Sequence, residues 1–407
     1  MKSNYAIGIK KKFKIFLVYV ERSLTVSSLV TTLTETLRYR GAIGQWSWVL
    51  HRITGLGVLF FFILHIIDTS WSVFYPELYE KAIAIYQTPL FTLGEFALVA
   101  AVVYHAFNGL RIGILDYNPR WWRFQQRAAV WVVAISVVVC IPVFLLMLGH
   151  VIKYYGSNPT ILPLTEVLAE QLPFIIGIGA GIVAAFVFAV LAGFVLGNKE
   201  PAVLGGKGGG SKLERFWWTY MRMSGLLIIP LVFGHLAVMH VVQGVFDLTV
   251  AGTTIPGVTA TVEQLGLNQY LGNAINDTGT AVEFVGERWN YLVASVAIWR
   301  FYDFALLFLA GVHGFNGLRY VLTDYTSKSV LLRRTSVYAC IIGAVVVIGV
   351  GGAALAGTIT DTSVKMAEKA RIALVGEIRG HGDETETENS TPVEESSTEE
   401  NTESNSD

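Results

Sequence analysis

The sequence predicts an all-α membrane protein: seven transmembrane helices arranged as two three-helix repeats in the same orientation, plus one linker helix. Composition is the first observation behind this prediction. The 407-residue chain is 53% hydrophobic and only 15% charged, with a mean hydropathy of +0.52, which is too apolar for an ordinary soluble domain. The second is a set of seven long apolar stretches. The third is a repeated motif, because HAFNGLRIGILDY at 105–117 recurs as HGFNGLRYVLTDY at 313–325 with eight of thirteen letters unchanged.

The apolar stretches are each about 20 residues long, which is enough for a helix to cross a bilayer. They lie near 48–70, 93–116, 128–152, 173–196, 217–243, 299–323 and 335–357. Basic residues are unequally divided between the connections. Ten lie near 117–127, 197–216 and 324–334, against four near 71–92, 153–172 and 244–300. By the positive-inside rule we expect a multi-pass protein of the cell membrane, with its N-terminus cytoplasmic and its C-terminus outside.

The repeat is larger than the thirteen-residue motif. RITG at 52–55 matches RMSG at 222–225, and His65 matches His235, both at an offset of 170 residues (222 − 52 and 235 − 65). Each repeat therefore has a first helix bearing Arg, Gly and His, a second helix that ends in the motif, and a plainer third helix.

The linker span follows from parity. Three spans would invert the second repeat, so the span at 173–196 returns the chain to the inside, and we expect its Gly177, Gly179 and Gly181 to pack closely against a neighbouring helix.

The chain divides into five segments on this scheme. They are an N-terminal cytoplasmic segment at 1–47, the first repeat at 48–152, the linker span and a Gly-rich cytoplasmic linker at 153–216, the second repeat at 217–357 with a long outside loop at 244–298, and an outside segment at 358–407 that ends in an acidic disordered tail. We expect the outside loop to form a cap.

Charge and cysteine content exclude several classes of function. The formal net charge is −1 and the basic residues form no single positive face, so we expect no nucleic-acid partner. Cys140 and Cys340 stand alone in apolar runs, which predicts inert core thiols. The chain also has no G-x-G-x-x-G strand–turn–helix and no cysteine cluster for an iron–sulfur centre.

Four histidines, one on each of four predicted spans, are the main functional signal. A histidine inside a membrane is costly and needs a partner or a role. A single one often bonds a neighbouring carbonyl, but symmetric pairs favour bis-histidine ligation of haem in a helical bundle. His105 and His313 lie eleven residues before the Asp of each motif, about 16 Å from the inner helix ends, and would form an inner pair.

A second pair would lie farther out. His65 is thirteen residues beyond Arg52, so His65 and His235 are expected about 11 Å outward of the inner pair, which suits a second haem. His240 competes with His235 for this role.

Other side chains on these helices suit a haem as well. Arg111 and Arg319 lie six residues after the inner histidines and could either bond haem propionates or anchor the helices at the inner surface. Four glycines would let backbone approach a flat macrocycle, or would serve helix packing alone: Gly55, Gly109, Gly225 and Gly317.

These residues resemble the cytochrome b membrane-anchor subunits of succinate dehydrogenase (complex II), with the larger and smaller anchors fused in one chain. LHRITG at 50–55 and the YH…G.R…D pattern at 104–116 resemble the larger anchor, and the pattern from His313 to VLTDY resembles the smaller one. The resemblance covers about 48–152 and 217–357.

The resemblance implies that His105 and His313 ligate haem b, with His51, Arg52 and Arg222 near its propionates. It also implies an inner quinone site, for menaquinone or ubiquinone, in which Tyr325 bonds a quinone carbonyl, Asp324 supports proton delivery and Arg52 lines the pocket.

One position departs from the family pattern. Some relatives carry a quinone-binding serine four residues before the arginine, whereas this chain has Trp48 there, with Ser47 beside it. Asp116 and Tyr117 are expected to cap and anchor their own helix instead of contacting quinone.

The outer histidine pair resembles the dihaem members, so we favour two haems b, with one as a minimum. An outer quinone site would then have Glu95 and Asp303 as proton-handling candidates. We favour an interfacial or salt-bridged role for both, such as pairing of Asp303 with Arg300. The implied partners are an iron–sulfur subunit and a flavoprotein subunit that oxidises succinate, besides membrane lipid, so the chain would carry only the quinone-reducing half-reaction.

Two other functions fit some of these features. A dihaem cytochrome b anchor of another quinone-linked dehydrogenase would share the histidine pairs, but the doubled motif and the HRITG start argue against it. A haem-free transporter built on a parallel repeat would use the histidines for proton transfer and would show no b-type absorption.

Overall fold

The structure, a computed structural model, is all-helical apart from one isolated bridge between Val293 and Val296 in the part of the chain that it describes. The described residues are 41–86, 89–156, 172–196, 212–237, 239, 278, 280–326 and 329–373. The predicted acidic tail and most of the N-terminal segment lie outside them, as do His240 and the first part of the outside loop.

Seven helices within these residues are long and apolar enough to cross a membrane, which confirms the predicted number. They are α3 (Ile43–Phe74), α5 (Pro89–Tyr117), α6 (Gln125–Gly156), α8 (Leu172–Leu196), α9 (Lys212–Leu236), α13 (Ile298–Tyr325) and α14 (Val330–Ala356). Three of them begin five residues before the predicted spans, at Ile43, Lys212 and Val330, because the first turns continue into the polar and basic residues at the membrane surface.

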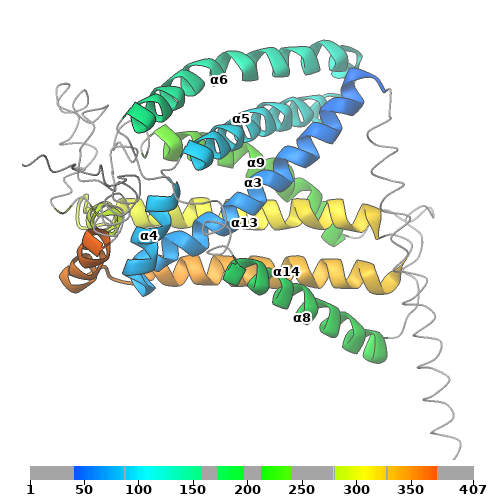
Figure 1. Cartoon of the computed structure of the whole chain (residues 1–407). Coiled ribbons are helices and arrows are strands. Elements are labelled where there is room, and N and C mark those ends of the chain that lie inside the picture. Colours follow the sequence, from blue (N-terminus) through cyan, green and yellow to red (C-terminus); the bar gives the residue numbers. More distant parts are fainter. Residues whose placement is uncertain are drawn as a thin grey trace, which may run out of the picture.

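The order of packing is alike in the two halves of the chain. α3 packs on α5 and α5 on α6, while α9 packs on α13 and α13 on α14. The halves meet where α3 crosses α13 and α14 and where α5 meets α9 (Figure 1). Close approach at the first crossing depends on Gly351, where an added Cβ would lie 2.8 Å from Ile66 and 2.9 Å from Leu307.

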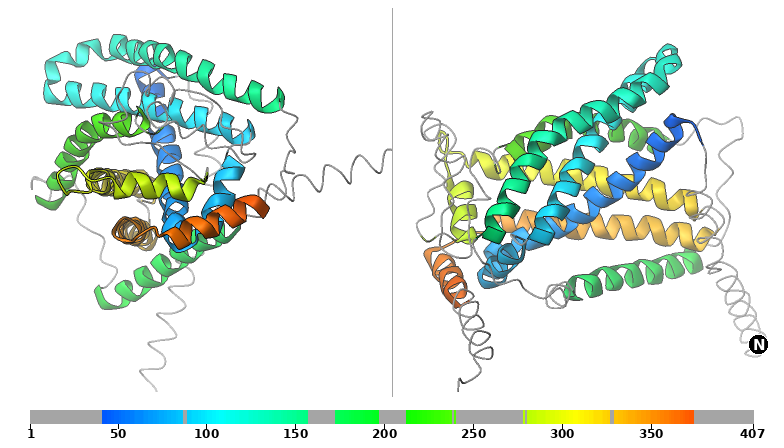
Figure 2. Two further views of the ribbon diagram at one scale, coloured as in Figure 1. Left: turned by 90° about the vertical axis from the view of Figure 1, so that its left-hand side faces the viewer. Right: turned by 45° about the horizontal axis from the view of Figure 1, so that its top comes forward.

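The linker helix α8 lies along the outside of α14 (Figure 2). Its buried residues are Ala185 and Ala189, both 0% exposed. The prediction that Gly177, Gly179 and Gly181 provide the close packing is wrong, because a Cβ at any of them would meet nothing within 4 Å. Small side chains do make this contact, but they are alanines farther along the helix.

A cap of short helices covers one end of the bundle, the end that the charge pattern predicts to be outside. It consists of α4 (Pro76–Tyr86), α12 (Ala281–Asn290) and a helix at 361–373 (Figure 1, left). α12 lies within the loop that we expected to form a cap. Its apolar face packs Val282, Phe284 and Trp289 against Ile359 and Ala367.

Polar contacts hold the cap together. The Thr280 hydroxyl caps α12 by accepting from the Glu283 N–H, and the buried Glu80 carboxylate on α4 accepts from the Ala281 N–H at 2.9 Å. Burial raises the pKa of Glu80 to about 7. The Arg371 guanidinium donates to the Thr278 carbonyl at 3.1 Å. The cap is therefore folded onto the bundle by specific hydrogen bonds as well as by apolar packing.

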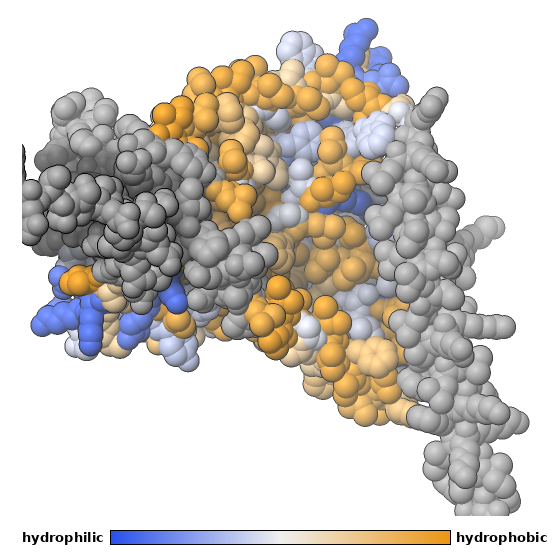
Figure 3. Space-filling view, in the orientation of Figure 1, coloured by the Kyte–Doolittle hydropathy of each residue, from blue (hydrophilic) through white to orange (hydrophobic). Residues whose placement is uncertain are grey.

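The surface agrees with a membrane setting. Hydrophobic side chains cover the middle of the bundle and hydrophilic ones gather toward its ends (Figure 3). On α6 the exposed residues include Trp131, Leu145 and Leu146, each at least 60% exposed, as lipid-facing side chains would be. Between α5 and α6, the short helix η1 (Pro119–Phe124) carries Arg120 and Arg123 at the basic end.

Candidate functional site

His105 on α5 and His313 on α13 face one another inside the bundle. Their ring centroids are 6.5 Å apart, and their planes make an angle of 87°. Two imidazoles on opposite sides of one metal lie at a similar spacing, because a metal–nitrogen bond of about 2 Å on each side and a ring radius of about 1.1 Å put the ring centres about 6 Å apart. The structure therefore brings together the two histidines of the repeated motif at the separation of an axial pair.

The Nδ1 atom of each ring meets oxygen atoms on the first helix of its own half. His313 Nδ1 lies 2.9 Å from the Ser224 hydroxyl. His105 Nδ1 lies 3.1 Å from the His51 carbonyl and 3.5 Å from the Thr54 hydroxyl. Thr54 and Ser224 stand at equivalent positions of RITG and RMSG, 170 residues apart. Sequence analysis missed both, although the shared offset and the paired hydroxyls could have identified them.

Two of the predicted glycines lie directly against these rings. A Cβ added at Gly55 would lie 2.7 Å from His105 Cε1, and one at Gly225 would lie 3.2 Å from His313 Cε1. Gly109 is next to the His51 ring, and its counterpart Gly317 is next to Met221. At Gly55, Gly109 and Gly225 the absence of a side chain therefore leaves room for a histidine ring, whereas Gly317 faces a methionine.

His51 and Arg111, two further predicted site residues, each have a buried polar atom without a hydrogen-bond partner among the described residues. The His51 ring stacks on the His105 ring with a centroid distance of 4.0 Å and an angle of 7°. Among the described residues, neither His51 Nδ1 nor Arg111 Nε has a hydrogen-bond partner, and both atoms are buried. Unpaired buried polar atoms are uncommon in folded proteins, so Arg111 Nε and, in its Nδ1–H form, the His51 ring are suited to binding an anionic group.

The rest of Arg111 is held by a buried network. Its Nη1 donates to the Ser47 hydroxyl and to Asn108 Oδ1, each at 2.5 Å, and the Tyr104 hydroxyl lies 3.1 Å from the Ser47 hydroxyl. Ser47, a candidate for quinone binding, is 4% exposed and belongs to this network. The described contacts do not join it to Arg52 or Asp324.

Arg319 has the same local geometry but a different electrostatic setting. Its Nε donates to Asn316 Oδ1 at 2.9 Å, as Arg111 donates to Asn108 in the first motif. It also donates two hydrogen bonds to the Glu214 carboxylate, at 3.0 and 3.4 Å. Arg319 is therefore already paired with a carboxylate, whereas Arg111 makes no ion pair with a described residue.

Two ion pairs join the halves reciprocally near the basic end. Arg52 of the first half pairs with Asp324 of the second, and Arg222 of the second half pairs with Asp116 of the first. Each guanidinium also lies over a tryptophan four residues earlier, at 3.9 Å for Trp48 and 3.3 Å for Trp218. The expectation that Asp116 caps its own helix is wrong, because its carboxylate binds a cation of the other half.

The two ion pairs differ in how many donors they use. Arg222 donates from Nε and Nη2 to Asp116 and from Nη1 to the Trp218 carbonyl. Arg52 donates to Asp324 from Nη2 alone within the described structure. The Asp324 side chain is 56% exposed, and the neighbouring Tyr325 is 55% exposed. Arg52 therefore has guanidinium N–H groups that the described residues leave available, next to the exposed Asp324 and Tyr325 side chains. In Arg222, all three guanidinium nitrogens already donate hydrogen bonds.

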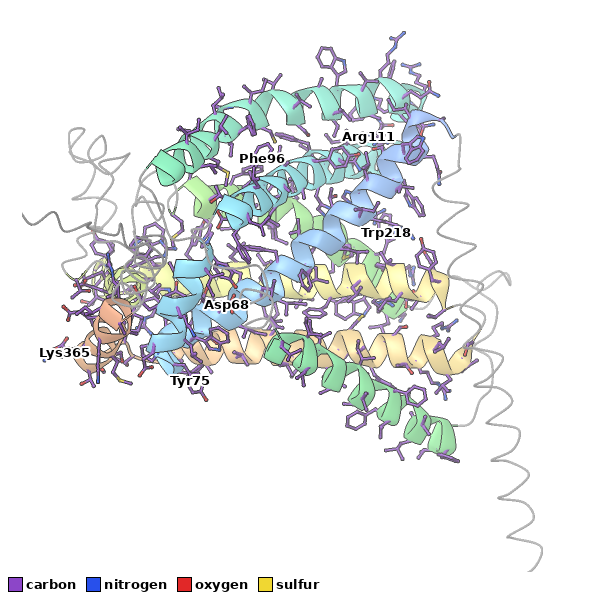
Figure 4. The ribbon with its side chains drawn as sticks, viewed as in Figure 1. Asp68, Tyr75, Phe96, Arg111, Trp218 and Lys365 are labelled. Atoms are coloured by element: carbon purple, nitrogen blue, oxygen red, sulfur yellow. The ribbon has the colours of Figure 1, made fainter. Side chains whose placement is uncertain are left out.

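Figure 4 places these groups along the bundle. Arg111 and Trp218 lie toward the end at which α3 begins, and Asp68 lies toward the cap. Tyr86 of the cap helix α4 donates to Asp68, which lies three residues after His65.

His65 and His235 also face one another, with ring centroids 6.2 Å apart and planes at 76°. His235 Nδ1 lies 3.5 Å from Asp303 Oδ1, which is close but outside hydrogen-bond geometry. Asp303 accepts from Arg288 Nη2 at 2.8 Å and from Trp289 Nε1 at 3.1 Å. The expected partner of Asp303 was Arg300, and this was wrong.

Arg300 instead binds carbonyl groups at the cap. It donates to the carbonyls of Trp289, Leu355 and Gly357. Glu95, the other outer candidate, lies in α5 and makes no ion pair with a described residue. Cys140 and Cys340 are free and buried, and no group of three or more His, Cys, Asp or Glu side chains in the described residues could hold a metal ion.

Comparisons with known proteins identify the family. The family model for the succinate dehydrogenase/fumarate reductase transmembrane subunit matches residues 31–144. The chain is 41% identical over 95 residues to the succinate dehydrogenase 2 membrane subunit SdhC of Mycobacterium tuberculosis, a match that covers 23% of this chain and 69% of that protein. It is 27% identical over 105 residues to a succinate dehydrogenase hydrophobic membrane anchor subunit of Halobacterium salinarum, covering 25% of this chain and 81% of that protein.

No solved structure matches the chain significantly. The matching family segment ends within α6, so it covers the first half and not the second. With its seven candidate spans, this multi-pass membrane protein belongs to the family of succinate dehydrogenase/fumarate reductase transmembrane subunits.

Proposed function

We propose that the chain is the haem b membrane anchor of a succinate:quinone oxidoreductase, in which it passes electrons from an iron–sulfur partner subunit to membrane quinone. The observation that carries the proposal is the facing pair of His105 and His313, 6.5 Å apart, contributed by the two copies of one motif. On this view the two copies of the motif belong to the larger and the smaller anchor, which are joined in one chain. Each copy would supply one axial ligand to the same haem.

The residues around the pair fit a haem. Gly55 and Gly225 leave the rings uncrowded, and the unpartnered His51 Nδ1 and Arg111 Nε would hold propionates. Arg319, Arg222 and Arg52 are bound by Glu214, Asp116 and Asp324, so of the five predicted propionate ligands His51 and Arg111 are the best supported. A haem b with two axial imidazoles accepts and releases one electron at a time.

We place a second haem between His65 and His235, whose ring separation of 6.2 Å is nearly that of the first pair. The pair lies nearer the cap, since Asp68 follows His65 by three residues and binds Tyr86 of α4. Asp303 and Arg288 would stabilise this region by charge pairing beside His235, which makes a structural role for Asp303 better supported than proton transfer.

We place the quinone headgroup at Arg52, Asp324 and Tyr325. Reducing a quinone requires hydrogen-bond donors at the carbonyl oxygens and a source of protons. Arg52 has donors left after it binds Asp324, and both Asp324 and Tyr325 are more than half exposed. Ser47 would not contact the quinone directly; its hydroxyl would instead hold Arg111 in place.

The partners in this proposal are an iron–sulfur subunit and a flavoprotein subunit that oxidises succinate. They would dock at the basic end, which holds the Arg52 and Arg222 ion pairs, because the positive-inside rule places that end in the cytoplasm. The cap and the C-terminal segment would then face outward.

A reduced-minus-oxidised spectrum of the purified complex, with haem quantified per chain, tests the haem proposal. We expect two haems b in the wild-type chain, loss of one in His105→Ala and loss of the other in His65→Ala. Leu145→Ala is the matched control, because this side chain is 60% exposed on the lipid face of α6. Absence of b-type absorption in the wild-type complex would refute the cytochrome function. A haem content of one per wild-type chain that is unchanged in His65→Ala would refute the second haem.

Quinone kinetics test the quinone site, and the reciprocal arginine is the control. We expect Arg52→Lys to raise the KM for quinone about tenfold, which corresponds to about 1.4 kcal/mol, because lysine lacks the planar set of donors. Arg222→Lys makes the same chemical change at the fully occupied ion pair and should leave this KM within about twofold. Equal effects of the two substitutions would contradict the assignment of the headgroup to Arg52.

A further inference from the structure

The hydroxyl groups of Thr54 and Ser224 form a matched pair that haem ligation and quinone binding leave without a role. Ser224 is 1% exposed and belongs to α9, and Thr54 occupies the equivalent place on α3. Each lies against the Nδ1 atom of one inner histidine, at 2.9 Å for Ser224 and 3.5 Å for Thr54.

The hydrogen bonds of Ser224 determine which nitrogen of His313 carries the proton. The Ser224 hydroxyl has one hydrogen, and it donates this hydrogen to the Tyr220 carbonyl of its own helix at 2.6 Å. Toward His313 the hydroxyl oxygen can therefore only accept. His313 Nδ1 must be the donor, and in a neutral imidazole the other nitrogen, Nε2, then carries the lone pair.

The same reasoning applies to His105 with different acceptors. Thr54 donates its hydrogen to the Leu50 carbonyl at 2.8 Å, so its oxygen also accepts from the ring. The His51 carbonyl, 3.1 Å from His105 Nδ1, can only accept. Among the described residues, His105 is thus held as the Nδ1–H tautomer by two acceptors and His313 by one.

We propose that Ser224 and Thr54 are positioning residues that fix the tautomer and ring orientation of His313 and His105, so that both present an unprotonated Nε2 to the same haem iron. This inference rests on the proposed function. It assigns to the repeated R-x-[ST]-G segment a role in ligand orientation: the hydroxyl holds the ring, and the following glycine leaves space for it. Partners of this kind typically change metal affinity 10- to 100-fold.

The two positions should differ in effect. Ser224→Ala leaves the His313 Nδ1–H without an acceptor in the described structure, while Thr54→Val leaves the His51 carbonyl available to His105. We therefore expect Ser224→Ala to weaken haem retention about 10- to 100-fold and Thr54→Val to weaken it less than about fivefold. Ser224→Thr and Thr54→Ser keep the hydroxyl and should restore wild-type behaviour.

The test uses the whole purified complex and reads the low-spin ferric haem by electron paramagnetic resonance, with a redox titration and haem content per chain. We expect the g values and midpoint potential of the inner haem to shift in Ser224→Ala, to shift less in Thr54→Val, and to return in the hydroxyl-bearing variants. Thermal unfolding checks that each variant is folded. If Ser224→Ala does not assemble, the comparison of Thr54→Val with Thr54→Ser tests the proposal.

The outcomes separate this inference from the proposed function. Absence of haem from the wild-type complex would refute the function itself. If the haem signals of Ser224→Ala and Thr54→Val were both identical to the wild-type signal, the positioning role would be overturned and the proposed function would stand. A larger effect of Thr54→Val than of Ser224→Ala would also overturn the positioning role, because His105 has a second acceptor in the His51 carbonyl and His313 has none among the described residues.

Discussion

Gly55 offers a direct measurement of how tightly the inner histidine is packed. An alanine at this position would place its Cβ 2.7 Å from His105 Cε1, about 0.7 Å inside the 3.4 Å at which ordinary contact begins. A Cβ at Gly57, two residues along α3, would meet nothing within 4 Å, so Gly57→Ala introduces the same methyl group into open space.

The comparison of the two variants isolates the steric cost. Both gain about 1 kcal/mol of helix propensity when alanine replaces glycine. Only Gly55→Ala must move a ring, and overpacking or an off-rotamer side chain of this kind costs about 1–3 kcal/mol. We therefore expect Gly55→Ala to retain haem about 5- to 150-fold less tightly than Gly57→Ala.

The assay is haem content per chain and thermal unfolding of the purified complex, measured for both variants and for Gly225→Ala. The last should lie between them, because its Cβ would be 3.2 Å from His313 Cε1. Equal haem retention in Gly55→Ala and Gly57→Ala would refute the reasoning, since it would mean that the ring does not need the space that Gly55 leaves.

Three further substitutions test the ion pairs and the cap. Asp116→Asn should lower the stability of the complex in thermal unfolding by only about 1 kcal/mol, because an ion pair whose side chains are partly exposed contributes little. Combining Asp116→Arg with Arg222→Asp restores opposite charges and should recover the lost stability. Burial raises the pKa of Glu80 to about 7, so the folded cap binds more protons than the open one and should weaken as pH rises from about 4.5 to 7, by up to about 3 kcal/mol. Hydrogen exchange of α12 should lose this pH dependence in Glu80→Gln, and unchanged dependence would exclude Glu80 as its source. Arg300→Lys should cost about 1–3 kcal/mol in thermal unfolding, because a lysine cannot reach the carbonyls of three separated residues, and a wild-type melting curve would contradict this.

Much of the architecture could be predicted because the bilayer imposes one strong rule on sequence. A span must be a continuous apolar helix, so the seven spans could be located from hydropathy alone. Equal spacing within two copies of a motif likewise predicted that His105 would face His313 and that His65 would face His235.

Contacts between side chains of different helices were harder to predict. The partners of Asp116 and Asp303 were missed because each lies on another segment, 106 residues away for Arg222 and 15 residues away for Arg288. The packing face of α8 was also missed, since an apolar helix with small residues on several sides does not show which side meets a neighbour.

The sequence by itself determined the membrane setting, the number of spans, and the pairing of histidines through the repeat. The orientation of the spans stays a prediction from charge. Only the tertiary structure decided which arginines are free to bind a ligand. Arg111 and Arg319 occupy the same place in the motif, but Glu214 neutralises Arg319, while Arg111 has a buried nitrogen without a hydrogen-bond partner among the described residues. The physical reason is that the charge state of a site depends on neighbours brought together by helix packing, and a repeated motif specifies its own residues without specifying those neighbours.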